Sequence, residues 1–301
     1  MTVMVEQAYM STVKTPGTGP AHSFAVCAYG ESPYLEACLR SLKAQTVKEG
    51  TEILICTSTP NSHISRLAEK YGVPLRVRDV EKEGGKRGIG PDWNFAFHCA
   101  SGKYVTLAHQ DDLYEKHYSE QLMKAAEQWP DMDLFTCAAV TIKNGKPERF
   151  PGAPEIVKTL LRIPLRFRGV AHLPLVKRLP LMFGNAVICP SVTYRKEAAE
   201  AVRGRAEAAD AARASGPFRE DRKFILDWEF LYDFAALPGR WICSERPLMF
   251  YRVHAGAATA ACIGDHVREK EETLMFRRLW PGWVAELILR WYRKSYDAYK
   301  E

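Results

Sequence analysis

Short apolar runs alternate with segments of helical periodicity through the first half of the chain. Apolar and β-branched runs predict strands at His22–Tyr29, Glu52–Cys56, Leu75–Val80 and Tyr104–Ala108. Apolar residues three or four positions apart predict helices at Tyr34–Gln45 and Ile64–Tyr71, from Asp92 to Phe97, and at Tyr114–Gln128. This alternation predicts an α/β fold, with a Rossmann-like, mostly parallel sheet flanked by helices on both faces.

The second half continues the alternation less regularly. Further strands are predicted at Leu134–Ile142, Ala186–Tyr194 and Trp241–Tyr251. Further helices are predicted at Ala198–Ala214, Lys223–Ala236 and Glu269–Tyr299, the last interrupted near Pro281 and Gly282. We therefore expect a flexible segment at 1–21, one nucleotide-binding domain at 22–262, and a C-terminal extension of amphipathic helices at 263–301.

The composition is that of a globular protein, with 47% hydrophobic and 26% charged residues. Charges or prolines interrupt every apolar run before the roughly 18 residues that a membrane-spanning helix needs. The N-terminus lacks the basic-then-apolar order of a secretory signal, so we expect a cytoplasmic protein. The 8 cysteines are scattered without a Cys-x-x-Cys pair, which favours reduced, buried thiols over a structural zinc site.

The net charge of +6 is unevenly distributed. No acidic residue lies between Glu155 and Glu197, and the basic insert at about 155–182 mixes arginine and lysine with leucine and phenylalanine. The tail repeats this mixture with Trp280, Trp283 and Trp291. Such segments are typical of helices at an anionic membrane surface, which would make the protein peripheral on the inner face of the cell membrane. Alternatively, these helices pack on the domain and expose only their charged tips.

The sharpest local signal is Asp111-Asp112 at the end of the predicted strand Tyr104–Ala108. Ligands bind at the carboxyl ends of the strands in sheets of this kind. Neighbouring carboxylates repel each other unless a cation or hydrogen-bond donors offset their charge. Oxygen ligands here suit a divalent metal, Mn²⁺ or Mg²⁺, bridging a diphosphate. The alternative is a solvated turn or a cap on the following helix.

The order of four segments resembles family 2 glycosyltransferases of the GT-A fold. Residues 28–46 are similar to the family's opening strand, turn and helix, and 88–114 to its glycine, asparagine-containing helix and acidic strand end. The similarity continues at 183–197 and at 227–259. The resemblance implies an inverting transferase of the bacterial surface-polysaccharide type, moving a sugar from a nucleoside-diphosphate sugar to a hydroxyl of a glycan or lipid-linked glycan.

The resemblance also implies roles for individual residues. Asp227 corresponds to the general base, Asp112 to the direct metal ligand, and Asp111 to a contact with ribose or metal. His254 corresponds to a histidine that approaches the metal or diphosphate. The helical position of Asp227, about 100° from the inward-facing Trp228, is compatible with a cleft.

Nucleotide-sugar contacts are expected at the ends of the first two strands and on the following helix. They are Ala28, Tyr29, Glu31, Thr57, Ser58 and Asn94, together with Asp111. Many family members carry an aspartate after the second strand that bonds the uracil imide, whereas this chain has Thr57-Ser58-Thr59. Hydroxyl groups also bond base edges. A UDP-sugar is the first expectation, with thymidine and guanosine nucleotides open.

Several alternatives stay open at the level of sequence. Glu229, Glu220 and Asp221 compete with Asp227 for the role of base. A nucleotidyltransferase of sugar phosphates, or a non-catalytic, membrane-associated nucleotide-sugar-binding protein, would also fit the α/β layout. The glycine-rich residues 83–91 lack the Lys-Ser/Thr ending of a phosphate-binding loop. No nucleic-acid-binding motif accompanies the basic charge, so we expect no nucleic-acid partner.

Overall fold

The computed structural model describes residues 19–148, 150, 152–205, 215–257, 262 and 264–293. Its strands are β1 (His22–Ala28), β2 (Thr51–Thr57), β3 (Leu75–Val77), β4 (Tyr104–His109), β5 (Leu113–Tyr114), β6 (Met132–Lys143), β7 (Lys146–Pro147), β8 (Thr193–Arg195) and β9 (Arg240–Val253). Its α-helices are α2 (Leu35–Lys43), α3 (Ser62–Tyr71), α4 (Ile89–Cys99), α5 (Tyr118–Gln128), α6 (Ala153–Arg162), α7 (Pro174–Arg178), α8 (Lys196–Arg205), α9 (Leu226–Phe234), α11 (Val267–Leu279) and α12 (Gly282–Arg293). The predictions for 1–18, 206–214 and 294–301 lie outside the described residues.

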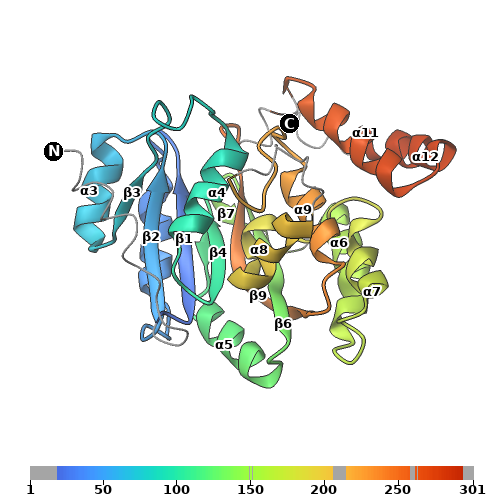
Figure 1. Ribbon diagram of the computed structural model, residues 1–301, viewed down its shortest axis with the longest axis horizontal. Coiled ribbons are helices and arrows are strands. Elements are labelled where there is room, and N and C mark those ends of the chain that lie inside the picture. The colour runs from blue at the N-terminus through green and yellow to red at the C-terminus, as the bar shows by residue number, and fades with distance from the viewer. Residues whose placement is uncertain are drawn as a thin grey trace.

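The strands form one sheet in the order β3-β2-β1-β4-β8-β6-β9-β5, with β7 paired to β6 (Figure 1). The first four strands are parallel to one another, and β6 and β9 form a second parallel pair. The short strand β8 joins the two groups, because it runs antiparallel to both β4 and β6. The predicted α/β fold is confirmed, with an antiparallel strand inserted at the middle of the sheet.

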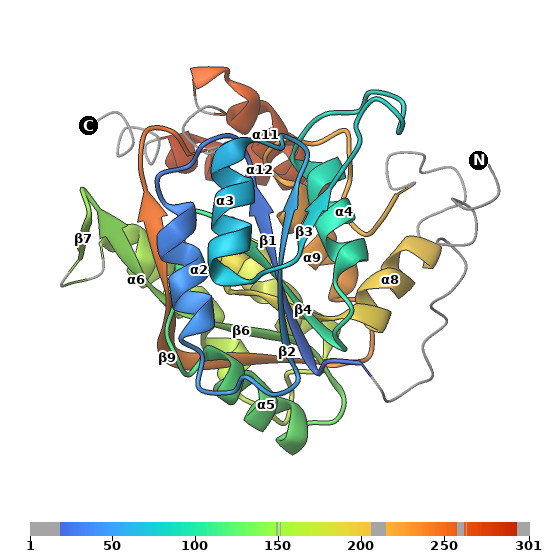
Figure 2. The same cartoon turned by 90° about the vertical axis from the view of Figure 1, so that its left-hand side faces the viewer.

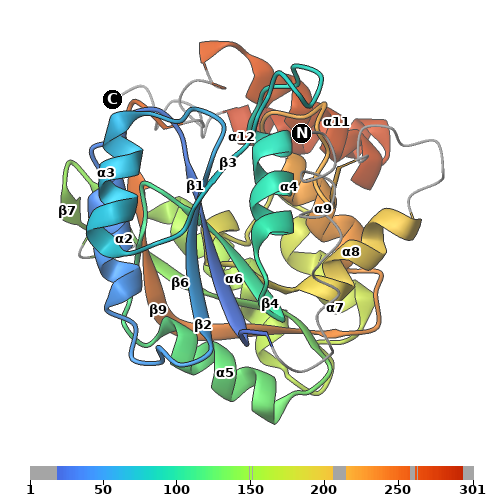
Figure 3. The same ribbon diagram turned by 60° about the vertical axis from the view of Figure 1, so that its left-hand side comes forward.

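Alternate residues of the strands face two separate hydrophobic clusters. Phe24 and Val26 of β1 pack with α2, α3 and α5 on one face, where Figure 2 shows α2 and α3 next to each other. Ala25 of the same strand, with Leu54 and Leu107, packs with α4, α8 and α9 on the other face (Figure 3). Successive apolar residues of a strand are therefore buried on opposite faces, as expected for a sheet covered by helices on both sides.

Two of the predicted elements that differ from the structure lie next to the candidate ligand edge. Tyr114, expected to begin a helix, lies in β5 and pairs with Met249 of β9, so α5 begins only at Tyr118. The strand expected at 186–194 is reduced to Thr193–Arg195. Pro190 has no N–H to donate to a ladder, and Cys189–Ser191 form a 3-10 turn instead.

The basic insert and the tail lie at the same end of the molecule. In Figure 1, α6, α7, α11 and α12 gather at the end opposite α3 and β3. The two segments touch, since Trp280 Nε1 donates to the carbonyl oxygen of Met182 at 2.7 Å and the Phe183 and Trp280 rings are 5.2 Å apart. Among the described residues, every helix is too short or too polar to cross a bilayer.

Candidate functional site

The carboxyl ends of β1, β2 and β4 form a continuous edge. The parallel register places Ala28 beside Thr57, and β4 lies on the other side of β1. The loops after β1 and β4 are joined by a reciprocal pair of hydrogen bonds. Tyr29 donates its N–H to Oε1 of Gln110 at 3.0 Å, and Nε2 of Gln110 donates to the carbonyl oxygen of Tyr29 at 3.0 Å. The predicted binding segments therefore lie together.

The turn after β1 directs side chains outward. Gly30 has φ +59°, a left-handed conformation that favours glycine, and donates its N–H to Oγ1 of Thr59 at 2.8 Å. Tyr29 is 67% exposed and Glu31 is also exposed, whereas Ala28 is buried. Among these three predicted nucleotide contacts, only Tyr29 and Glu31 present side chains to solvent.

Thr57 and Ser58 lie at the end of β2, next to an aspartate that sequence reasoning missed. Ser58 Oγ donates to Oδ2 of Asp92 at 2.9 Å, and Arg78 Nη1 lies 3.2 Å from the other oxygen, Oδ1. Burial raises the pKa of the Asp92 carboxyl group, while Ser58 and Arg78 oppose the shift. The sequence signal that could have indicated Asp92 is its position in the first turn of α4, a helix that follows the ligand-binding edge of the sheet.

The acidic pair after β4 meets the end of β9. Asp112 is buried, and its Oδ1 accepts the N–H of Arg252 at 2.8 Å. Burial raises the pKa of Asp112 to about 8, while the bond from Arg252 opposes this shift. Asp111 is more exposed, and its Oδ2 lies 3.0 Å from Nε2 of His254. The pairing of β5 with β9 explains how residues so far apart in sequence come together.

An aromatic residue from the start of α2 completes this side of the site. The centroid of the Tyr34 ring lies 4.4 Å from the guanidinium carbon of Arg252 and 4.8 Å from the centroid of the His254 ring. The Arg252 side chain is held further by the backbone of the acidic pair, because its Nε donates to the carbonyl oxygen of Asp111 at 2.9 Å. Neither Tyr34 nor Arg252 was predicted as a site residue, although each lies in a segment that resembles the family.

The donor set of Asp111, Asp112 and His254 fits a divalent cation in chemistry. Carboxylate oxygens suit Mg²⁺ and Mn²⁺, and an imidazole nitrogen adds a preference for Mn²⁺. Oδ2 of Asp111 and Nε2 of His254 are already 3.0 Å apart. No cluster of three or more such side chains is arranged as a complete metal site in the described part of the chain. A cation held here would need ligands from a bound diphosphate as well.

Asp227 lies in the first turn of α9, and its carboxylate accepts a hydrogen bond from Nδ2 of Asn185 at 2.8 Å. Burial raises the pKa of Asp227 to about 6, although the bonds it accepts, including one from the Cys189 thiol, oppose the shift. Cys189 Sγ in turn lies 3.9 Å from Nε2 of His109 at the end of β4. Asp227 is thereby linked to the strand end that carries the acidic pair.

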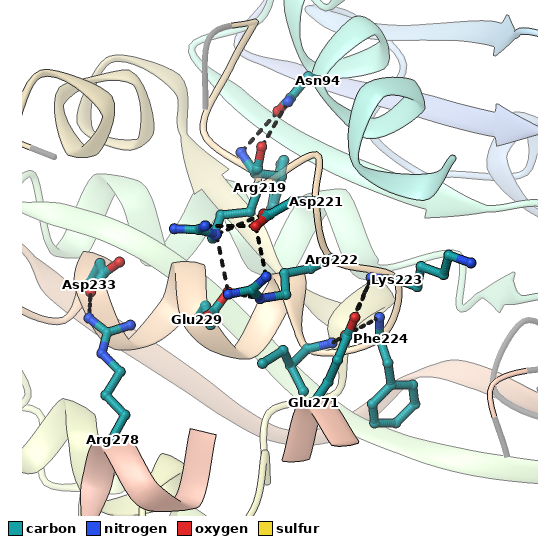
Figure 4. Close-up of polar contacts among 12 residues, drawn as sticks. Asn94, Arg219, Asp221, Arg222, Lys223, Phe224, Glu229, Asp233, Glu271 and Arg278 are labelled. Carbon is teal, nitrogen blue, oxygen red and sulfur yellow. Dashed lines mark hydrogen bonds and ion pairs between the residues drawn. The ribbon is translucent and has the colours of Figure 1, made fainter. Parts of the chain in front are cut away.

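The three competing carboxylates have cationic partners. Glu229 and Asp221 both pair with Arg222, at 3.2 and 2.7 Å (Figure 4). Glu220 pairs with Lys86 at 2.9 Å. Ion pairs of this kind keep a carboxylate a weak base, whereas burial without a cation strengthens it. Among the described residues, Asp227 has no arginine or lysine within ion-pair distance. This contrast favours Asp227 as the proton acceptor.

Asn94 is engaged in a structural contact. Its Oδ1 accepts the N–H of Phe218 at 2.9 Å, and its Nδ2 donates to the Phe218 carbonyl oxygen at 2.8 Å and to Ser215 Oγ at 3.2 Å. The residue is buried, and Figure 4 shows it directed at the segment before α9. This arrangement favours a positioning role over the direct nucleotide contact that the sequence predicts.

The model of the family described as "Glycosyl transferase family 2" matches residues 23–175, about half of the chain. The chain belongs to glycosyl transferase family 2. The matched region contains β1 to β4, the acidic pair and the Ser58–Asp92 contact, whereas Asp227 and His254 lie beyond it.

Two curated relatives of the chain come from Bacillus subtilis (strain 168) and are named as glycosyltransferases. EpsH is 29% identical over 128 residues, which are 42% of this chain and 36% of the relative. EpsJ is 29% identical over 119 residues, or 39% of this chain and 33% of the relative. The chain thus aligns with about a third of the length of these proteins.

Solved structures share the fold at low sequence identity. Mannosyltransferase PcManGT from Pyrobaculum calidifontis, in complex with GDP-Man and Mn²⁺, has a TM-score of 0.59 at 16% identity, covering 99% of this chain and 79% of that one. S. aureus TarS 1-349, in complex with UDP-GlcNAc, has a TM-score of 0.57 at 16% identity, covering 89% and 70%. These similarities confirm the GT-A fold predicted from the sequence.

Proposed function

We propose that the protein transfers a sugar from a nucleoside-diphosphate sugar to a hydroxyl acceptor, with inversion at the anomeric carbon. The main support is the position of Asp227. Its carboxyl group has a raised pKa and no ion-pair partner in the described part of the chain, and it is linked through Cys189 and His109 to the strand end that carries the acidic pair. A base and a diphosphate-binding edge on neighbouring elements are the two parts that a direct displacement needs.

Asp227 accepts the proton of the acceptor hydroxyl as that oxygen attacks the anomeric carbon. Asn185, which precedes β8 in the chain, holds the Asp227 carboxylate in place through a hydrogen bond. Asp111, Asp112 and His254 would hold Mn²⁺ or Mg²⁺, which when bound acts as a Lewis acid for the departing diphosphate. Arg252, kept against Tyr34, contributes a positive charge on the same side.

The nucleobase is proposed to lie at the ends of β1 and β2. Tyr29 offers an exposed aromatic ring, and the Asp92 carboxylate, which also accepts the Ser58 hydroxyl, offers an acceptor. A carboxylate acceptor suits a base with a ring N–H, such as uracil, thymine or guanine. The TarS and PcManGT structures contain UDP-GlcNAc and GDP-Man respectively. UDP-sugars stay the first choice, and GDP-sugars follow.

A nucleotide panel tests this proposal. We expect UDP or GDP with Mn²⁺ to raise the melting temperature, because a ligand at about 100 times its Kd stabilises the folded state by about 2.7 kcal/mol. CDP and ADP, which lack the ring N–H, should give smaller shifts. Equal shifts for all nucleotides, with or without Mn²⁺, would contradict the proposed site. Release of pyrophosphate instead of a nucleoside diphosphate would favour a nucleotidyltransferase, and stabilisation without turnover would favour a binding protein.

The surface at the end of the molecule that carries the basic insert and the tail supports a membrane-bound acceptor. Large apolar side chains are exposed on both, namely Ile156, Val157, Leu160, Phe167, Leu175, Trp283 and Leu287. No acidic residue lies between Glu155 and Glu197 to oppose an anionic surface. We propose peripheral binding to the inner face of the cell membrane and a glycan or lipid-linked glycan as acceptor.

Flotation with anionic vesicles tests the membrane proposal. We expect the protein to float with phosphatidylglycerol vesicles at low salt, and the double change Trp283→Ser with Leu287→Ser to lower the bound fraction several-fold. These side chains lie one turn apart on the exposed side of α12, where both would enter the interface. Val77→Ser, at an exposed position on β3, is the control and should leave flotation unchanged. Wild-type protein that stays unbound at low salt excludes this mode of binding.

A further inference from the structure

Helix α11 contacts α9, the helix of the proposed base, along its length. Before the first turn of α9, the Glu271 side chain accepts backbone hydrogen bonds. In the first turn of α9, Trp228 packs edge-on against Phe276 of α11, with ring centroids 5.1 Å apart. Near the end, Arg278 Nη2 donates to Oδ1 of Asp233 at 2.6 Å. Figure 4 shows the first and last of these contacts, so α11 belongs structurally to the catalytic domain.

The contact of Glu271 is made with the residues that lead into α9. Its Oε2 accepts the N–H of Phe224 at 2.8 Å and that of Ile225 at 3.1 Å, and its Oε1 accepts the N–H of Lys223 at 3.1 Å. Ile225 is the residue immediately before α9, and Asp227 lies in the first turn. A single buried carboxylate therefore holds three consecutive residues next to the proposed base.

This arrangement depends on a charged group with two acceptor oxygens. Bonds from backbone N–H groups to a carboxylate are charge-assisted and stronger than those between neutral groups. The negative charge of Glu271 also lies at the N-terminus of α9, where the helix dipole favours it. A glutamine at this position keeps one acceptor oxygen but replaces the second with an NH₂ group, which cannot accept from an N–H.

The segment before α9 has a second anchor at its far end. Asn94 of α4 holds Phe218, seven residues ahead of Ile225 in the chain. Glu271 is the anchor nearest to Asp227, whose carboxylate must stay close to the Asn185 amide. A displacement of about 1 Å at a reacting group is enough to lower a rate by roughly 10²-fold.

We propose that Glu271 is a positioning residue of the transfer reaction: by holding Lys223–Ile225, it keeps Asp227 aligned with Asn185 and the acceptor hydroxyl. The C-terminal helix α11 thereby supports the geometry of the active site, although it lies outside the matched family region. This inference rests on the proposed function and assigns a role to a residue that touches neither substrate nor metal.

Two variants of Glu271 and one control test the inference in the full-length chain. Glu271→Ala is expected to lower kcat by about 10–10²-fold, and Glu271→Gln by less, because one acceptor oxygen remains. The KM for the nucleotide sugar should stay within about 2-fold of wild type. The nucleotide-dependent rise in melting temperature should stay within a few degrees of wild type. Asp265→Asn, an exposed acid just before α11, should behave as wild type. Amide hydrogen exchange of residues 223–225 should accelerate in the order wild type, Gln, Ala.

The outcomes separate this inference from the function on which it rests. Folded Glu271 variants with wild-type kcat and accelerated exchange at 223–225 would overturn the positioning role alone. A parallel loss of kcat and nucleotide binding would also overturn it, since that pattern indicates general destabilisation. A wild-type protein that binds nucleotide without transferring sugar would contradict the proposed function and, with it, the positioning role.

Discussion

Asp227→Asn is expected to lower kcat by roughly 10²–10⁴-fold, the usual contribution of a general base. The substitution keeps the size of the side chain but removes its ability to accept a proton from the acceptor hydroxyl. Nucleotide binding should persist, because Asp227 contacts Asn185 and Cys189 and lies on a different element from Thr57, Ser58 and the acidic pair. Initial rates with labelled nucleotide sugar measure the first effect, and nucleotide-dependent melting shifts measure the second.

The pH profile of the wild type gives an independent test of the same assignment. Burial raises the pKa of Asp227 to about 6, and a base acts only when deprotonated, so kcat should fall as the pH drops below about 6. Asp221→Asn, which removes an exposed and ion-paired competitor, should retain both the rate and this profile. A near-normal rate for Asp227→Asn, or a large loss for Asp221→Asn, contradicts the assignment of the base.

The parts of the fold that the sequence predicted well are those encoded by neighbouring residues. Strands β1 and β4 follow continuous apolar runs and lie buried on both faces, so their limits differ from the predicted ones by a single residue. Helix α3 begins at a turn where Asn61 accepts the N–H of Ile64 at 2.9 Å and ends at Gly72 in the left-handed conformation. These are local signals that a pattern of residues carries by itself.

The parts that the sequence did not predict depend on contacts between distant segments. Tyr114 joins a strand because β9 lies beside it, and its hydroxyl donates to the carbonyl oxygen of Pro190 at 2.7 Å. Asn185 lies in a segment that resembles the family but had no predicted role, and Glu271 lies outside all such segments. Each acquires its role only when α9 is placed next to it. Asp92 occupies a helix start, where an acid has an ordinary explanation, and only the fold brings Ser58 to it.

Asp112→Ala is expected to abolish measurable transfer and the Mn²⁺-dependent part of nucleotide binding. A cation beside a leaving diphosphate supplies several kcal/mol of transition-state stabilisation, so the loss of a ligand should lower the rate by roughly 10³-fold or more. The same change removes the acceptor for the Arg252 N–H, which should cost about 1–3 kcal/mol of folding stability. Rates and nucleotide-dependent melting shifts, each with and without Mn²⁺, measure both effects.

Asp112→Asn separates metal binding from folding, because the asparagine carbonyl oxygen still accepts the Arg252 N–H while the negative charge is lost. It should match Asp112→Ala in lost transfer and Mn²⁺ response but retain most of the wild-type stability. Asp79→Asn, a change at a partly exposed acid after β3, is the control and should alter neither property. If Asp112→Asn keeps a wild-type rate and a full Mn²⁺-dependent melting shift, Asp112 is no metal ligand. The buried carboxylate would then serve only to hold the end of β9, and with it His254, against the acidic loop.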